Sequence, residues 1–141
     1  MYLLDTDHVV VLQRSTGIEF EHLTGRMADY SDDSFFYSVV AFHEQMLGAH
    51  TYIARARDRH GAVRGYSLLE RVLTDFSLQE VLPFNEPAAR KFDELRASRV
   101  RIGTMDLRIA SIALARNMTV LTRNLIDFQR VPGLAVEDWT T

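Results

Sequence analysis

The sequence predicts an α/β protein in which helices cover a parallel sheet, and two observations lead to this fold class. Short apolar segments that suit strands alternate along the chain with longer segments whose apolar residues recur at helical spacing. The chain has 141 residues, 47% of them hydrophobic and 25% charged, which is the composition of an ordinary globular protein with a core of its own. We therefore expect residues 1–141 to form a single domain.

The first half of the chain is expected to contain two strands and four helical segments. Each strand candidate is a short apolar run beside a polar turn, and the helical segments are amphipathic. Gly61 is expected to separate the two longest helices. In order, the elements are strand 1–4, helical segments 8–14 and 18–27, a turn at 31–34, strand 35–38, and helices 39–59 and 62–76.

The second half is expected to contain three strands and two helices. Pro83 closes a strand at 79–82, and Asn85 opens a helix that has a proline in its first turn and reaches residue 100. A mostly apolar helix follows. The last two strands are expected at 118–121 and, after a turn at 131–133, at 134–137.

The mostly apolar helix contains an unusual carboxylate, Asp106. Gly103 and Thr104 provide a helix break and an N-cap candidate, and Asn117 is a C-cap candidate. The residues three, four and seven positions beyond Asp106 are all apolar, so the carboxylate lies on an apolar stripe. Acids are seldom buried without a partner, although the helix dipole also favours an acid in a first turn.

Three further acids extend this pattern. Glu44 lies on an apolar stripe of the helix at 39–59, Asp5 directly follows the first strand, and Asp127 comes shortly after the strand at 118–121. In parallel sheets, sites form beyond the carboxyl ends of the strands, so these acids are candidates to meet there. Clustered carboxylates repel one another unless a metal ion neutralises them. Oxygen ligands in a chain without cysteine favour Mg²⁺, with Mn²⁺ as an alternative, over zinc.

Several other classes of function lack support in the sequence. The absence of cysteine excludes disulfides and thiolate metal sites. The five histidines do not have the spacing of a zinc protease, and neither a glycine-rich phosphate loop nor a nucleophile elbow is present. No signal peptide opens the chain, and no run approaches the roughly 20 apolar residues that span a bilayer, so we expect a cytoplasmic protein without a membrane partner.

Charge is distributed unevenly along the chain, although the net charge is only −3. Residues 1–50 carry eight acidic and two basic side chains, whereas residues 90–130 carry nine basic and four acidic ones. Almost all the cations are arginines, which suit phosphate contacts, although a compositional bias of the genome explains the same ratio. The basic segment permits an anionic polymer as substrate.

These motifs, in this order, resemble a PIN-domain ribonuclease of the VapC toxin type, from type II toxin–antitoxin systems. The resemblance covers nearly the whole chain. The segments responsible are LLDTD at 3–7, SVVAFHE at 38–44 with Leu47 and Gly48, DLRIA at 106–110, LTRN at 121–124 with Asp127 and Phe128, and VPGL at 131–134. The resemblance implies a three-layer sandwich whose central parallel sheet has the order 3-2-1-4-5. It also implies magnesium-dependent cleavage of RNA, a VapB-type antitoxin and a homodimer.

The resemblance also implies roles for individual residues. The family's four acids correspond to Asp5, Glu44, Asp106 and Asp127, which are expected to be catalytic and to hold the metal. Polar positions near them, in contact with substrate or behind the ligands, correspond to Thr122, Asn124 and Asp7. Asp7 departs from the asparagine that is more usual there, and it is expected either to tighten metal binding or to face solvent.

Two other functions remain open at this point. A non-catalytic binding module could share the fold, because fold alone does not confer function. The LLDTD motif also resembles the nucleophile motif of haloacid-dehalogenase-type phosphatases, but the acidic pair expected downstream is absent and the single lysine, Lys91, lies on a polar helix face. For an antitoxin, an inserted cation could fill the acidic crevice, and apolar residues at 9–12 and 20–23 could form a groove for a partner helix.

Overall fold

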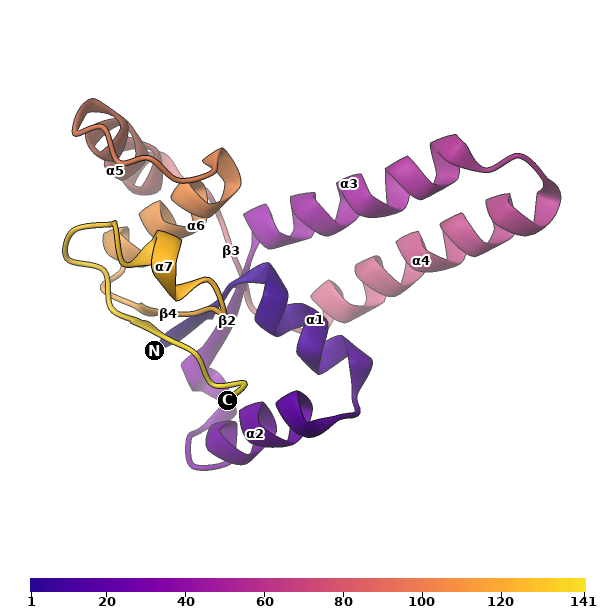
Figure 1. Cartoon of the computed structure of the whole chain (residues 1–141), viewed down its shortest axis with the longest axis horizontal. Coiled ribbons are helices and arrows are strands. Elements are labelled where there is room, and N and C mark those ends of the chain that lie inside the picture. The colour runs from indigo at the N-terminus through magenta and orange to yellow at the C-terminus, as the bar shows by residue number, and fades with distance from the viewer.

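The computed structural model describes all residues, 1–141, and contains one five-stranded sheet (Figure 1). The strands pair in parallel and lie in the order β3-β2-β1-β4-β5. The predicted fold class and the strand order implied by the resemblance are therefore confirmed. The strands are β1 (Tyr2–Leu4), β2 (Phe35–Ser38), β3 (Val81–Leu82), β4 (Thr119–Leu121) and β5 (Val136–Glu137).

The central strand, β1, is the point at which the strand order reverses. Tyr2 is in register with Phe35 of β2 on one side and with Thr119 of β4 on the other. Leu4 is in register with Leu121, so the residues that follow them, Asp5 and Thr122, leave the sheet side by side. This is the position at which parallel α/β sheets build their sites.

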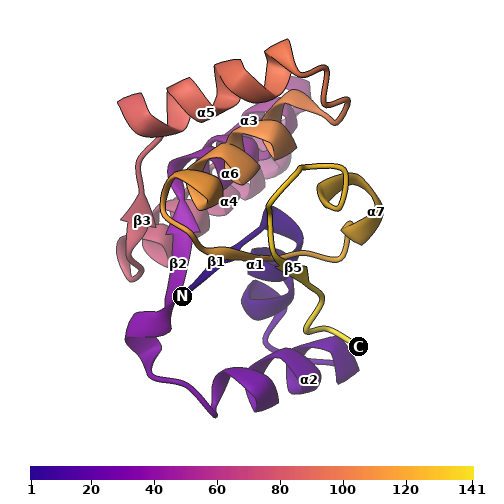
Figure 2. The same ribbon diagram turned by 90° about the vertical axis from the view of Figure 1, so that its left-hand side faces the viewer.

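Helices cover both faces of the sheet, because neighbouring strand residues point to opposite sides. Leu3 belongs to a core that contains residues of α5 and α6, whereas Leu4 belongs to a core that contains residues of α1, α2 and α4. Figure 2 shows α5 and α6 on one side of the sheet and α1 and α2 on the other. The helices are α1 (Thr6–Arg14), α2 (Ile18–Met27), α3 (Val39–Arg55), α4 (Arg59–Ser77), α5 (Glu86–Ala97), α6 (Thr104–Ala115) and α7 (Leu125–Phe128), with one 3-10 turn at Asp32–Ser34.

The two longest helices, α3 and α4, form a hairpin that extends away from the sheet (Figure 1). The predicted break at Gly61 is wrong, because Gly61 lies inside the first turn of α4. The break falls instead at residues 56–58, where Asp58 caps α4 by accepting a hydrogen bond from the Gly61 N–H at 2.7 Å. A Cβ on Gly65 would lie 2.6 Å from Ile53 Cγ1, so the helices approach closely there. None of the helices combines the length and the apolar character that crossing a membrane requires.

Caps explain the other shifted boundaries. The first helix begins at Thr6 rather than at residue 8, because Asp5 caps it. Gly103, not Thr104, is the N-cap residue of α6. Asn117 does end that helix region, since its φ of 54° is left-handed and the next N–H, of Met118, returns to the Ala113 carbonyl at 2.9 Å.

Candidate metal centre

Asp5 lies at the carboxyl end of β1, and its backbone N–H and both carboxylate oxygens form hydrogen bonds. Its backbone N–H donates to Leu121 O at 2.9 Å, which continues the ladder to β4. Its Oδ1 accepts from the Thr6 N–H at 2.8 Å, and its Oδ2 accepts from the Thr122 hydroxyl at 2.9 Å. The side chain is therefore fixed in orientation, and the residue is only 5% exposed.

Glu44 and Asp106 approach Asp5 from two different helices. Glu44 lies in the second turn of α3, and its Oε1 accepts from the Thr6 hydroxyl at 3.0 Å. Asp106 lies in the first turn of α6. One oxygen from each of the three carboxylates can be chosen so that all three atoms lie within 4.8 Å of one another. Three acids far apart in the sequence thus converge on one point. We refer to Asp5, Glu44 and Asp106 as the acidic triad.

This convergence changes the acidity of the carboxyls. The pKa of Asp5 is raised to about 7, chiefly by burial and then by the nearby charges of Asp7 and Asp106, while hydrogen bonds from Thr122 and Thr6 lower it by less. Burial, followed by the charges of Glu44 and Asp127, raises the pKa of Asp106 to about 6. Without a cation, the cluster therefore retains protons that isolated carboxyls would lose near pH 4.

Asp127 lies beside this triad but outside it. It belongs to the short helix α7, which Asn124 caps and which the sequence did not predict. Its Oδ2 accepts from Asn124 Nδ2 at 2.9 Å, and its Oδ1 lies 3.6 Å from Nη1 of Arg130. Its charge still raises the pKa of Asp106, so Asp127 belongs to the surroundings of the triad.

Asp7 lies beside the triad without belonging to it, and its carboxylate is bound by other groups. Its Oδ2 accepts from the Arg123 N–H at 2.9 Å and lies 3.4 Å from the Thr122 hydroxyl. Its Oδ1 lies 2.9 Å from Nδ1 of His8. These contacts anchor the loop after β4, and the charge of Asp7 also raises the pKa of Asp5 and of Asp106. A contribution of this charge to metal binding stays a prediction.

His8 is a buried polar residue to which the sequence assigns no role. It is completely buried and connects Asp7 to the backbone of Trp139. The available signal was its spacing, because a residue three positions after Asp5 on α1 faces the same side of that helix. The sequence alone did not show what it would contact.

The triad fits a divalent metal ion. All three candidate ligands are carboxylate oxygens, the donor type of hard cations, and no nitrogen or sulfur donor belongs to the group. Burial first, and neighbouring negative charges second, raise the pKa of Asp5 and of Asp106, and a bound cation would offset both effects.

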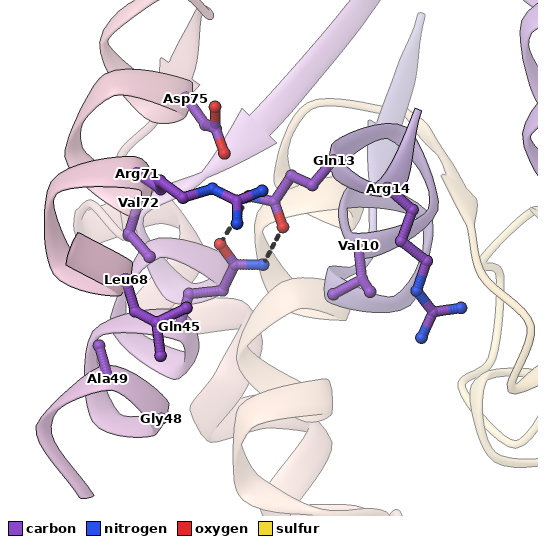
Figure 3. Close-up of a pocket in the computed structure, with 10 residues that line it drawn as sticks. All are labelled: Val10, Gln13, Arg14, Gln45, Gly48, Ala49, Leu68, Arg71, Val72 and Asp75. Atoms are coloured by element: carbon purple, nitrogen blue, oxygen red, sulfur yellow. Dashed lines mark hydrogen bonds between the residues drawn. The ribbon is translucent and has the colours of Figure 1, made fainter. Parts of the chain in front are cut away.

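A separate groove of about 400 Å³ lies between α1 and the α3–α4 hairpin (Figure 3). At its centre, the side-chain amides of Gln13 and Gln45 exchange two hydrogen bonds of 2.8 and 2.7 Å. Of the residues expected to form a partner groove, Val10 lines this one, whereas Val9, Val11 and Leu23 are buried in the core. The remaining lining residues are Val10, Arg14, Gly48, Ala49, Leu68, Arg71, Val72 and Asp75.

The fold and the site together define a class of protein. A parallel sheet of order 3-2-1-4-5, with carboxylates gathered at the end of its central strand, is the arrangement of PIN-domain nucleases. Comparison with known proteins agrees with this class. No family model matches the chain, but curated proteins and solved structures do.

The chain belongs to the VapC family of ribonucleases. It is 30% identical over 138 residues to Ribonuclease VapC of Rickettsia bellii, covering 95% of this chain and 92% of that protein. It is 29% identical over 142 residues to the tRNA(fMet)-specific endonuclease VapC of Salmonella typhimurium, covering 98% and 97%. The crystal structure of VapBC2 from Rickettsia felis, bound to a DNA fragment from their promoter, superimposes with a TM-score of 0.72 at 25% identity and 98% coverage of both chains. The predicted family is confirmed, and the relatives favour the ribonuclease over the phosphatase and the non-catalytic module.

Proposed function

We propose that this protein is a Mg²⁺-dependent endoribonuclease that acts as the toxin of a toxin–antitoxin pair in the cytoplasm, with Mn²⁺ as an alternative metal. The observation that supports this most strongly is the convergence of Asp5, Glu44 and Asp106 within 4.8 Å in a member of a ribonuclease family. The single domain and the homodimer remain predictions.

In this proposal each acid has its own role. Asp5 and Asp106 bind the metal ion, directly or through water, while Glu44 and Asp127 complete the shell or orient water. Thr122 fixes Asp5 by its hydrogen bond of 2.9 Å, and Asn124 fixes Asp127 at the same distance. When bound, the cation supplies a Lewis acid that lowers the pKa of water and stabilises charge on the phosphate.

Arginines beside the acids provide a reason for RNA to approach a negatively charged site. Arg123 and Arg130 are both about half exposed and lie on either side of α7. Arg130 donates to the Arg101 carbonyl at 3.1 Å, which holds a third exposed arginine beside it. Guanidinium groups bind phosphate oxygens in pairs, so these side chains are suited to the RNA backbone.

The partner in this proposal is a VapB-type antitoxin, since solved complexes of similar chains, such as VapBC2 of Rickettsia felis, contain one. Its amphipathic segment would lie in the groove between α1 and the α3–α4 hairpin, which offers apolar side chains with charged groups at the margin. An arginine or lysine of the same segment would enter the acidic triad as a cation.

The proposed function is tested by incubating the purified protein with total RNA in Mg²⁺ and, in parallel, with excess EDTA. A small phosphate ester in the same buffers tests the phosphatase alternative. RNA cleavage that requires Mg²⁺, without phosphate release from the ester, is the expected result. RNA cleavage of equal rate in EDTA, or no cleavage of any RNA by protein freed of its partner, would overturn the proposal.

A further inference from the structure

We propose that His8 is a positioning residue of the metal centre, which acts by holding Asp7 and, through it, the loop that orients Asp5. The inference rests on the proposed function, because it assumes that the acidic triad binds a metal ion. His8 touches none of the three triad carboxylates, so its effect must pass through other side chains.

The contacts of His8 indicate which tautomer the neutral ring adopts. The Trp139 N–H, which can only donate, lies 3.2 Å from Nε2 of the imidazole, so Nε2 is the acceptor. In the neutral ring the proton is then on Nδ1, which lies 2.9 Å from Oδ1 of Asp7 and donates to it. Because the ring is completely buried, water cannot replace either contact.

Asp7 passes this constraint to the loop after β4. Its second oxygen, Oδ2, accepts from the Arg123 N–H at 2.9 Å. Each carboxylate oxygen thus has a donor of its own, His8 on one side and the Arg123 backbone on the other. An asparagine at position 7 would offer only one acceptor oxygen, so Asp7 and His8 are matched to each other.

The loop in turn orients a metal ligand. The hydroxyl of Thr122 has one proton, which it shares more closely with Asp5 Oδ2 at 2.9 Å than with Asp7 Oδ2 at 3.4 Å. The same hydroxyl accepts from the Asn124 N–H at 3.0 Å. Fixing the backbone at Arg123 therefore fixes the hydroxyl that aims Asp5. Groups that support metal ligands in this way typically change metal affinity about 10- to 100-fold when lost.

Two amide substitutions separate the two contacts of the ring. In His8→Asn, the amide nitrogen can occupy the place of Nδ1 and donate to Asp7, while the contact with Trp139 is lost. In His8→Gln, the amide oxygen can occupy the place of Nε2 and accept from Trp139, while the contact with Asp7 is lost. His22→Gln is the control. His22 contacts the same C-terminal segment, through the Thr140 carbonyl at 3.1 Å, but it makes no hydrogen bond to Asp7.

The measurement is the Mn²⁺ concentration that gives half of the maximal rise in melting temperature. We expect His8→Gln to need about tenfold more Mn²⁺ than wild type, and His8→Asn and His22→Gln to stay within about threefold. Equal behaviour of the two His8 variants, whether both match wild type or both lose affinity alike, would overturn the inference. A wild-type protein that Mn²⁺ does not stabilise would instead overturn the proposed function, and the positioning role with it.

A second measurement does not depend on either variant folding. Nitrogen-15 NMR of the histidines in the metal-free wild-type protein distinguishes the two neutral tautomers of His8. We expect the proton on Nδ1, although free histidine prefers Nε2. A proton on Nε2 would contradict the inference, because Nδ1 could not then donate to Asp7.

Discussion

The Thr6 hydroxyl donates a hydrogen bond to Oε1 of Glu44 at 3.0 Å, which joins the first residue of α1 to the second turn of α3. The backbone N–H of the same threonine donates to Oδ1 of Asp5 at 2.8 Å. One residue therefore fixes two of the three triad carboxylates, and it does so before any metal ion binds. Such prior orientation lowers the cost of assembling a site.

Replacing Thr6 by valine should release Glu44 but leave the hydrogen bond from the backbone N–H of residue 6 to Asp5, because valine keeps the shape and the N–H but lacks the hydroxyl. We expect Mg²⁺ affinity to fall by about tenfold, with little change in melting temperature of the metal-free protein. Isothermal titration with Mg²⁺ measures the affinity. Thr6→Ser, which retains the hydroxyl, is the control and should bind as wild type does.

Asp5→Asn and Asp106→Asn should each abolish RNA cleavage without unfolding the protein. The amide retains the size of the side chain, and asparagine caps a helix as well as aspartate does, but the charge that holds the metal is lost. Initial cleavage rates on a defined RNA measure the effect. Asp93→Asn, on the exposed surface of α5, removes the same charge elsewhere and should leave the rate unchanged. Wild-type cleavage by either triad variant would show that the triad is not the active site.

Mg²⁺ or Mn²⁺ should raise the melting temperature, because an ion that binds only the folded state stabilises it by mass action. At about 100 times the dissociation constant the gain is roughly 2.7 kcal/mol, which corresponds to a shift on the order of 10 °C for a domain of this size. Differential scanning fluorimetry at increasing metal concentration measures it. The shift should be far smaller in Asp106→Asn, and equal shifts in both proteins would argue for unspecific binding.

The stability of the metal-free protein should depend on pH through Asp5. Burial raises its pKa from 3.8 to about 7, so the folded state binds this proton more tightly than the unfolded state does. The resulting stabilisation is complete below about pH 4 and is lost as the pH rises through 7. The neutral amide in Asp5→Asn does not titrate, so the variant should gain stability relative to wild type as the pH rises from about 4 to 7. Urea unfolding in EDTA measures this difference, and a constant difference across the range would contradict the assignment.

Inhibition by the antitoxin should weaken when the arginine or lysine that it inserts into the triad is replaced by alanine. Without that side chain, the antitoxin no longer competes with the metal ion for the three carboxylates. Binding should largely survive, since the groove between α1 and the α3–α4 hairpin still holds the partner. Leu68→Asp in that groove should have the opposite profile and reduce binding itself. RNA cleavage and affinity, measured together across a Mg²⁺ titration, separate the two effects. Full inhibition by the alanine variant would exclude occupation of the triad.

The positions of the five strands and the three acids that converge were predictable from the sequence, and the acids for a clear physical reason. A carboxylate on an apolar stripe, as at Glu44 or Asp106, conflicts with its surroundings, and such conflicts mark functional positions. Helix ends were predicted less well, since Gly61 appeared to be a break whereas the Asp58 cap decides the boundary. His8 could not be assigned, because its partner Trp139 is 131 residues away and only the folded sheet brings them together.

The position of β1 at the centre of the sheet also determines when the site can form during synthesis. β1 precedes α6 and β4 in the chain, yet Thr122 contacts Asp5 across 117 residues of sequence. Pairs so distant in the chain form late in folding. Until β4 and α6 have been translated, β1 has one bare edge and the third carboxylate is absent. A nascent chain that has not yet reached α6 and β4 therefore lacks both the complete triad and the Thr122 hydroxyl that orients Asp5.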